Sequence, residues 1–223
     1  MILCGRDVFV RASAARCLTL ALGFSILSVG GAAAVECPTS YPFNDDNVDF
    51  YDPEPRVQAR IRGIESNHMN ENVRSLKRGQ STANVSGDLR FVIVIVPNHP
   101  EALGLMMRLA LRTRTDTLPE TAPYPVECWL HRATVFRPND GASLLIYGVY
   151  LSRRGKVAEA VSALERADEL KPGDANVAYN LGLMYFEKRD YKRSLEYAKR
   201  AYDAGFPLPG LKNKLTQAGQ WSD

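Results

Sequence analysis

The sequence has 223 residues, with 28 basic and 25 acidic side chains, and its formal net charge is +3. Residues 1–34, interpreted below as a signal peptide, contain three arginines and one aspartate, so the net charge of the remainder falls by two, to +1. This balance argues against nucleic-acid binding. The 189 residues that follow suffice for one core of ordinary size or for one elongated solenoid.

An export signal is the first predicted element. Three arginines precede an uncharged apolar run over residues 18–30, and residues 32–34 supply the alanines behind which a signal peptidase cuts. The run is shorter than the roughly 20 residues that span a bilayer, which disfavours the alternative of an uncleaved anchor helix. We therefore expect a signal peptide over residues 1–34, cleavage near Ala34 and a periplasmic mature protein.

The cysteines are interpreted in the light of export. Cleavage would remove Cys4 and Cys17 and leave Cys37 and Cys128 as the two thiols of the mature chain. Two cysteines in an exported protein predict one disulfide. Two buried free thiols are the alternative.

Residues 35–98 are expected to form an N-terminal arm followed by degenerate helices. Residues 38–55 are rich in proline, asparagine, aspartate and aromatic residues, which predicts an extended arm. Two short helices are expected over residues 56–64 and 70–76, separated by residues 66–68. Both helices would precede the repeats.

Residues 91–96 are a run of phenylalanine, valine and isoleucine with strong β preference. No second convincing strand lies nearby, and an unpaired strand would leave its backbone groups unsatisfied. The run also fits the repeat spacing described next. We therefore expect it to be helical.

Residues 99–223 are predicted to form helical repeats. Residues 141–174 align with residues 175–208 at a spacing of 34. The matched pairs include Gly148 with Gly182, Leu151 with Tyr185, Ala160 with Ser194, Leu164 with Ala198 and Ala167 with Ala201. Each unit contains a helix, a tight turn and a second helix, which is an αα-hairpin.

The same spacing extends in both directions. Helices over residues 100–111 and 125–136 would form a third, imperfect hairpin with an inserted loop between them. Downstream, proline and glycine break the chain over residues 205–210. Residues 211–217 are then expected to form a helix that caps the apolar face of the last repeat.

On these residues the chain resembles the tetratricopeptide-repeat family. The residues that carry the resemblance are Tyr147, Gly148, Leu151, Ala160, Leu164, Ala167 and Pro172 in one unit, and Leu181, Gly182, Tyr185, Tyr191, Ala198 and Ala201 in the other. The resemblance implies an all-α fold, a short solenoid of αα-hairpins. Residues 37–223 are also similar to small secreted proteobacterial tetratricopeptide proteins, through stretches such as residues 97–103 and 126–129, and this similarity implies no activity.

Stacked hairpins build a concave face from their opening helices. The repeat spacing directs seven residues into that face: Leu145, Val149, Ser152, Asn176, Tyr179, Leu183 and Phe186. Some tetratricopeptide domains hold a partner's C-terminal carboxylate with Lys and Asn at the positions of Leu145 and Val149, so this sequence departs from the carboxylate clamp. The arm or the capping helix may instead fill the groove, and then basic residues between Lys188 and Arg200 are the alternative surface.

No catalytic or metal-binding motif is recognised. His68, His99 and His131 lack the spacing of metal ligands, and the sequence has no Gly-x-Ser-x-Gly elbow and no Gly-rich phosphate loop. We therefore predict a non-enzyme with no catalytic residue, metal or cofactor.

The predicted function is a periplasmic scaffold or adaptor that binds a protein or peptide partner, for example in assembly of an envelope complex. Contact with a membrane surface is a further possibility for the basic residues. The alternative function is an accessory or regulatory subunit of a cell-envelope enzyme or transporter.

Overall fold

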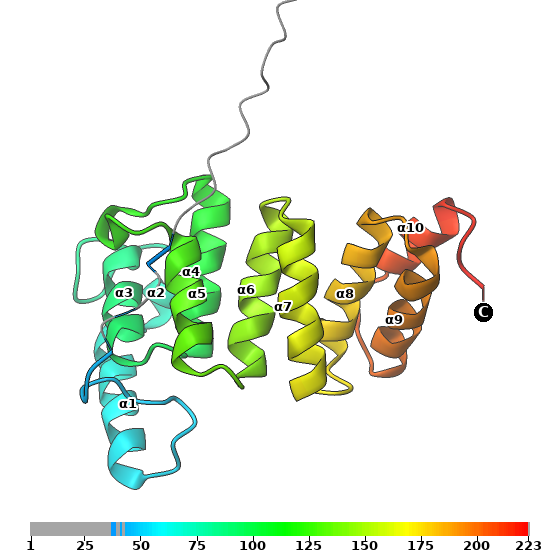
Figure 1. Cartoon of the computed structure of the whole chain (residues 1–223). Coiled ribbons are helices and arrows are strands. Elements are labelled where there is room, and N and C mark those ends of the chain that lie inside the picture. Colours follow the sequence, from blue (N-terminus) through cyan, green and yellow to red (C-terminus); the bar gives the residue numbers. More distant parts are fainter. Residues whose placement is uncertain (1–36, 39–40, 42, 223) are drawn as a thin grey trace, which may run out of the picture. The chain divides into compact units, whose positions relative to one another are not determined.

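A computed structural model describes residues 37–38, 41 and 43–222. The predicted signal peptide over residues 1–34 lies outside the described residues. Throughout the described part the regular structure is helical and no strand is found (Figure 1), which confirms the all-α prediction. None of the helices in this part is both long enough and apolar enough to traverse a bilayer.

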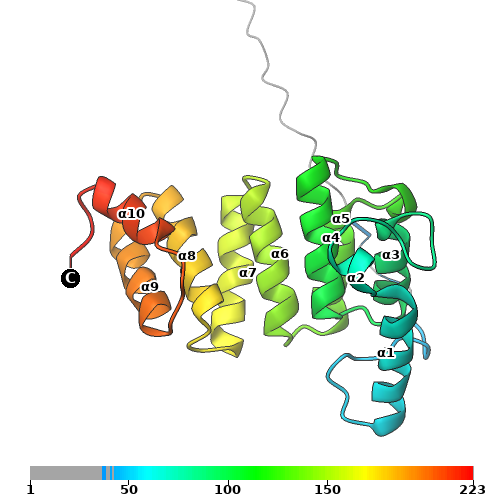
Figure 2. The same ribbon diagram turned by 180° about the vertical axis from the view of Figure 1, so that it is seen from behind.

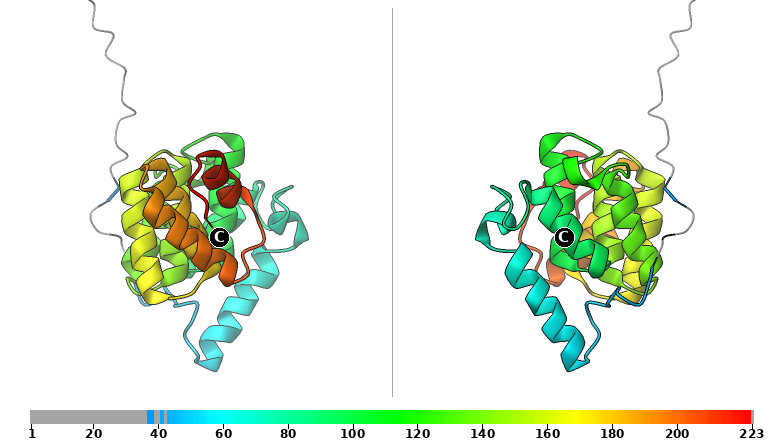
Figure 3. Two further views of the ribbon diagram at one scale, coloured as in Figure 1. Left: turned by 90° about the vertical axis from the view of Figure 1, so that its right-hand side faces the viewer. Right: turned by 90° about the vertical axis from the view of Figure 1, so that its left-hand side faces the viewer.

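The helices follow one another in the order in which they pack. They are α1 Pro55–His68, α2 Glu71–Arg74, α3 Val85–Ile95, α4 Pro100–Thr113, the 3-10 helix η1 Pro119–Thr121, α5 Val126–Phe136, α6 Gly141–Arg153, α7 Val157–Leu170, α8 Ala175–Glu187, α9 Tyr191–Asp203 and α10 Gly210–Gln217. The hairpins α6–α7 and α8–α9 have extensive contacts, and α7 packs on α8 (Figure 2). Figure 3 shows α1 projecting away from the later helices.

The two predicted repeats have the same internal packing. A Cβ added to Gly148 would lie 3.4 Å from the carbonyl oxygen of Ala160, and one added to Gly182 would lie 3.4 Å from the carbonyl oxygen of Ser194. Both glycines therefore allow an opening helix to approach the backbone of its closing helix. The equal distances confirm that the spacing of 34 residues is a structural register.

The starts of the opening helices also repeat. Asp140 and Asp174 each accept a hydrogen bond, both 2.9 Å long, from the amide of the second residue that follows. Such bonds satisfy amides that have no partner within the helix. The predicted capping role of Asp174 is confirmed, and Asp140 has the same role one repeat earlier.

Residues 91–96 are helical up to Ile95, as predicted against their β preference. Leu89, Val92 and Ile93 of α3 are at most 1% exposed and belong to the core formed with α4 and α5. Burial on a helix face thus outweighs local propensity. Phe91 points outward and is 43% exposed.

The predicted break before the second short helix is wrong. Residues 66–68 still belong to α1, and the chain turns at Met69 and Asn70 instead. Asn70 caps α2 by accepting hydrogen bonds from the amides of Asn72 and Val73. His68 extends α1 because it is held by a buried contact described below.

The described arm residues run without helix along α3 and α5. The amide of Val48 donates to the carbonyl of Ile95 over 2.9 Å, and the amide of Phe50 donates to Asn98 Oδ1 over 3.0 Å. The predicted disulfide joins Cys37 to Cys128 of α5, with the two Cα atoms 5.2 Å apart. The arm is therefore attached covalently to the third hairpin.

Candidate binding site

The opening helices α4, α6 and α8 lie side by side, since α6 contacts both of the others. We call the side of these helices that carries the seven predicted residues the inner face. Asn176 is exposed and the other six residues are half-buried. Leu145 of α6 and Leu183 of α8 pack against the same hydrophobic cluster. The structure thus brings both halves of the predicted set together.

The C-terminal segment covers the α8 half of the inner face. The ring of Phe206 stacks on that of Tyr179 with centroids 3.9 Å apart, and Lys214 Nζ lies 5.2 Å from the centroid of Phe186. Leu183 packs against the cluster that contains Leu211 of α10. One of the two occupants left open by the sequence, the capping helix, therefore takes this half.

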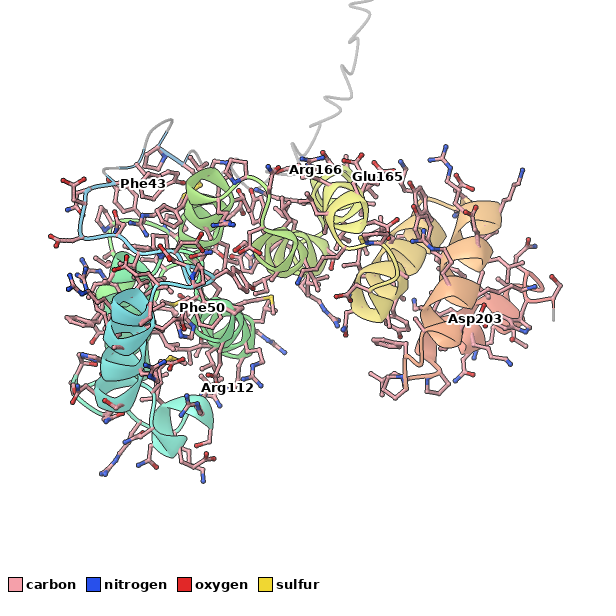
Figure 4. All side chains as sticks on the ribbon, turned by 90° about the horizontal axis from the view of Figure 1, so that it is seen from below. Phe43, Phe50, Arg112, Glu165, Arg166 and Asp203 are labelled. Atoms are coloured by element: carbon pink, nitrogen blue, oxygen red, sulfur yellow. A yellow bond between two sulfur atoms is a disulfide. The ribbon has the colours of Figure 1, made fainter. Side chains whose placement is uncertain are left out.

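The arm lies elsewhere. Its Tyr41 hydroxyl is 3.0 Å from His131 Nδ1, and its Phe43 ring is 5.1 Å from the ring of Phe136. Both partners belong to α5, a closing helix. Figure 4, a view from below, places Phe43 and Arg112 on opposite sides of the row of helices. The alternative in which the arm fills the inner face is therefore not supported.

The surface that stays open lies over α4 and α6. Leu145 and Val149 are half-buried on α6, and a Cβ added to Gly104 of α4 would meet no atom within 4 Å. Arg108, which the spacing of 41 residues aligns with Val149, is exposed beside them. This arginine was not among the predicted residues, although the offset between the third hairpin and the first full repeat identifies it.

The alternative basic surface is partly used in packing. Arg200 donates two hydrogen bonds, of 2.7 and 3.0 Å, to the carboxylate of Asp168, and this contact raises its pKa. Arg193 donates to the hydroxyl of Tyr185 over 3.3 Å. Lys188 and Arg189 are exposed. Two of the six basic side chains thus link helices to one another.

A buried carboxylate in α3 was not predicted. Asp88 is fully buried and accepts hydrogen bonds from the amides of Gln80 and Ser81, over 2.6 and 3.1 Å, while His68 Nδ1 lies 2.7 Å away. Burial by itself would raise the pKa of Asp88, but these hydrogen bonds lower it. The group fixes the loop between α2 and α3 to the core.

The other two histidines also have structural contacts. His99 caps α4, as the sequence predicts: its Nδ1 accepts from the amide of Ala102 over 3.2 Å, and its Nε2 lies 3.0 Å from Glu65 Oε1. Burial lowers the pKa of His99 although Glu65 acts in the opposite direction. His131 is half-buried against Tyr41 and Tyr147, so its predicted place on an exposed face is wrong. Within the described ranges, no three His, Cys, Asp or Glu side chains converge as metal ligands.

Arg132 connects the arm to α3. Its guanidinium donates to the carbonyl of Ile93 over 2.7 Å and lies 4.8 Å from the ring centroid of Phe43. The side chain is buried, and burial lowers its pKa to about 10. The arginine thus satisfies a carbonyl group near the C-terminus of α3, where positive charge is favourable.

No protein-family model matches the sequence, and no curated protein matches it. Solved structures do match. PilF of Pseudomonas aeruginosa, a tetratricopeptide-repeat protein, is similar with a TM-score of 0.51 over 73% of this chain and 69% of the PilF chain, at 17% sequence identity. The chain has a tetratricopeptide-repeat fold.

Two further tetratricopeptide structures are similar to this array. YrrB, described as a TPR protein with an unusual peptide-binding site, has a TM-score of 0.45 and 20% identity over 60% of this chain. The crystal structure of MamA has a TM-score of 0.41 and 18% identity, over 61% of this chain and 70% of the MamA chain. The array spans 64% of the YrrB chain, slightly less than two thirds of its length.

Proposed function

We propose that this chain is a non-catalytic scaffold that binds a protein or peptide partner on the open part of the inner face. The observation that carries the proposal is the apolar surface of Leu145 and Val149 on α6, next to the uncovered Gly104 of α4. Stacked helical hairpins use such surfaces for binding.

The chemistry of this surface favours an apolar segment with an acidic flank. Leu145 and Val149 offer apolar contacts, and Ser152 is occupied by a 2.8 Å hydrogen bond to the carbonyl of Val149. Arg108 and Arg112 lie exposed along α4, and Arg112 is anchored by a 2.7 Å bond to the carbonyl of Leu76. Positive charge at the rim of an interface accelerates association with acidic partners.

We further propose that the scaffold acts in the periplasm, in assembly of an envelope complex. The arginine-flanked apolar run and alanine cleavage site of residues 1–34 support export. The Cys37–Cys128 disulfide suits an oxidising compartment. Cell fractionation and the mass of the mature protein test both points, since cleavage near Ala34 removes a segment of defined mass.

Site-specific photocrosslinking in intact cells tests the binding surface. A photoreactive residue at Leu145 is expected to give a discrete adduct with one protein, because this position lies on the open surface. The same residue at Glu196, exposed on α9, serves as the control. The adduct should disappear when Val149 is changed to Asp. Equal adducts at both positions, or none at Leu145, would rule out this face as the binding site.

A further inference from the structure

A hollow of about 430 Å³ lies between α5, α6 and α7. Its apolar lining comes from Leu144, Tyr147, Leu151 and Ala163, and Arg166 lies at its rim. Figure 4 places Arg166 and Arg112 on opposite sides of the row of helices, so the hollow faces away from the inner face. It is therefore separate from the site of the proposed function.

The equivalent position one repeat later is filled. Tyr197 of α9 stands 34 residues after Ala163, and Tyr185 of α8 stands 34 residues after Leu151. The rings of these two tyrosines stack with centroids 5.5 Å apart, and the guanidinium of Arg200 lies 4.7 Å from the centroid of Tyr197. The first junction lacks both rings, and this difference accounts for the hollow.

An ion pair is missing at the first junction as well. At the second junction, Arg200 binds Asp168 with two hydrogen bonds. The equivalent residues at the first junction are Arg166 and Thr134, and threonine has no carboxylate to offer. Thr134 donates instead to the carbonyl of His131 over 2.8 Å.

The unmatched arginine is directed toward solvent. Arg166 contacts Glu169 on its own helix over 2.6 Å and Asn139 over 2.8 Å, and its side chain is 47% exposed. An exposed pair of this kind contributes little stability and is easily exchanged for another partner. Arg166 is thus available to a carboxylate from outside the chain.

From this comparison we propose that the hollow is a docking site for a partner protein that presents an aromatic side chain beside a carboxylate. The ring would lie over Ala163, where Tyr197 lies in the next junction. The carboxylate would bind Arg166, as Asp168 binds Arg200. The volume is ample, since an apolar cavity of about 150 Å³ holds benzene in another protein.

N-acetyl-tyrosine, which has both a phenol ring and a carboxylate, is the probe for this site. In an NMR titration of the purified protein we expect shifts at Leu151, Ala163 and Arg166. N-acetyl-tyrosine amide, which lacks the charge, should bind several-fold more weakly. N-acetyl-leucine, which lacks the ring, should produce no saturable shift at these positions.

Two variants copy the filled junction into the empty one. Ala163→Tyr fills the hollow and should weaken binding of N-acetyl-tyrosine at least tenfold, whereas Ala158→Tyr, at an exposed position of the same helix, should leave it unchanged. Thr134→Asp supplies Arg166 with a partner and should remove the advantage of the carboxylate probe over its amide. This second variant keeps the test valid if Ala163→Tyr fails to fold.

The proposal is overturned by either of two results. One is the absence of saturable shifts around Ala163, or shifts that persist in Ala163→Tyr. The other is that the same resonances move with protein concentration alone, which would make a second copy of the chain the occupant. Neither result affects photocrosslinking from Leu145, so the two sites are tested independently.

Discussion

The arm with helices α1–α5 and the repeats α6–α9 are stabilised by different kinds of contact. In the repeats, small residues at helix crossings recur every 34 positions, as at Gly148 and Gly182. The N-terminal region is held by single links between distant residues, such as the Cys37–Cys128 disulfide and the His68–Asp88 contact. Repeat packing distributes stability over nearest neighbours. The N-terminal region instead concentrates it in a few replaceable bonds.

Removing the disulfide is the strongest test of this difference. Replacing Cys37 and Cys128 with serine opens a loop between residues 91 positions apart, which should lower the free energy of unfolding by about 4 kcal/mol. Urea unfolding measures the loss, and reductant should reproduce it in the wild-type protein. Hydrogen exchange should show reduced protection in α3 and little change in α8. Equal losses in both helices would mean that the two regions are not stabilised separately.

Asp88→Asn is expected to have the next largest effect. The change removes the charge that His68 and two loop amides bind inside the core, and breaking a buried pair of this kind costs about 3 kcal/mol. Asp46→Asn is the matched control, because the Asp46 side chain is 82% exposed and only 3.8 Å from Arg60. A similar shift of the urea midpoint in both variants would contradict the structural role of Asp88.

Two glycine substitutions should have effects of opposite sign. Gly148→Ala places a Cβ 2.7 Å from Leu164 Cγ, and the required shift should cost about 1–2 kcal/mol. Gly63→Ala adds a methyl group to α1 with no atom within 4 Å, and should stabilise by about 0.5–1 kcal/mol through helix propensity. Thermal unfolding of both variants checks the prediction. Destabilisation by Gly63→Ala would show that the surface of α1 is covered.

The smallest expected effect is a dependence on pH in the N-terminal region. Burial lowers the pKa of His99 below its ordinary value of 6.5, so the unfolded chain binds a proton before the folded chain does. The stability from neutral His99 is complete above about pH 6.5 and is lost as pH falls below it. His99→Asn keeps a capping side chain and should flatten the decrease in Tm. An unchanged pH profile would exclude His99 as its source.

The periodic part of the fold was predictable because each repeat contains the same information twice. The bounds of α7, residues 157–170, and the helical state of residues 91–95 both follow from the spacing. The end of α1 did not follow, because it depends on the contact between His68 and Asp88. Contacts of one side chain with a distant backbone group, such as Arg132 with the carbonyl of Ile93, carry no periodic signal.

The candidate site was predictable to a similar extent. Repeat spacing placed Leu145 and Leu183 on one face, and the structure brings them to the same cluster. It did not predict that Phe206 would stack on Tyr179, because the chain after α9 has no counterpart in the repeat. It also missed the hollow beside Ala163, which became evident only by comparing the two junctions in space.

The bond between Cys37 and Cys128 also determines how the protein would carry a mechanical load. Tension applied to the chain before Cys37 would pass through the sulfur atoms directly into α5, and the intervening segment with α1–α4 would bear none of it. From α5 the force would continue into the repeats through neighbouring contacts, including the 2.6 Å pair between Glu127 and Lys156. In an oxidised protein under tension the repeats would therefore yield first, and after reduction the N-terminal helices would be loaded as well.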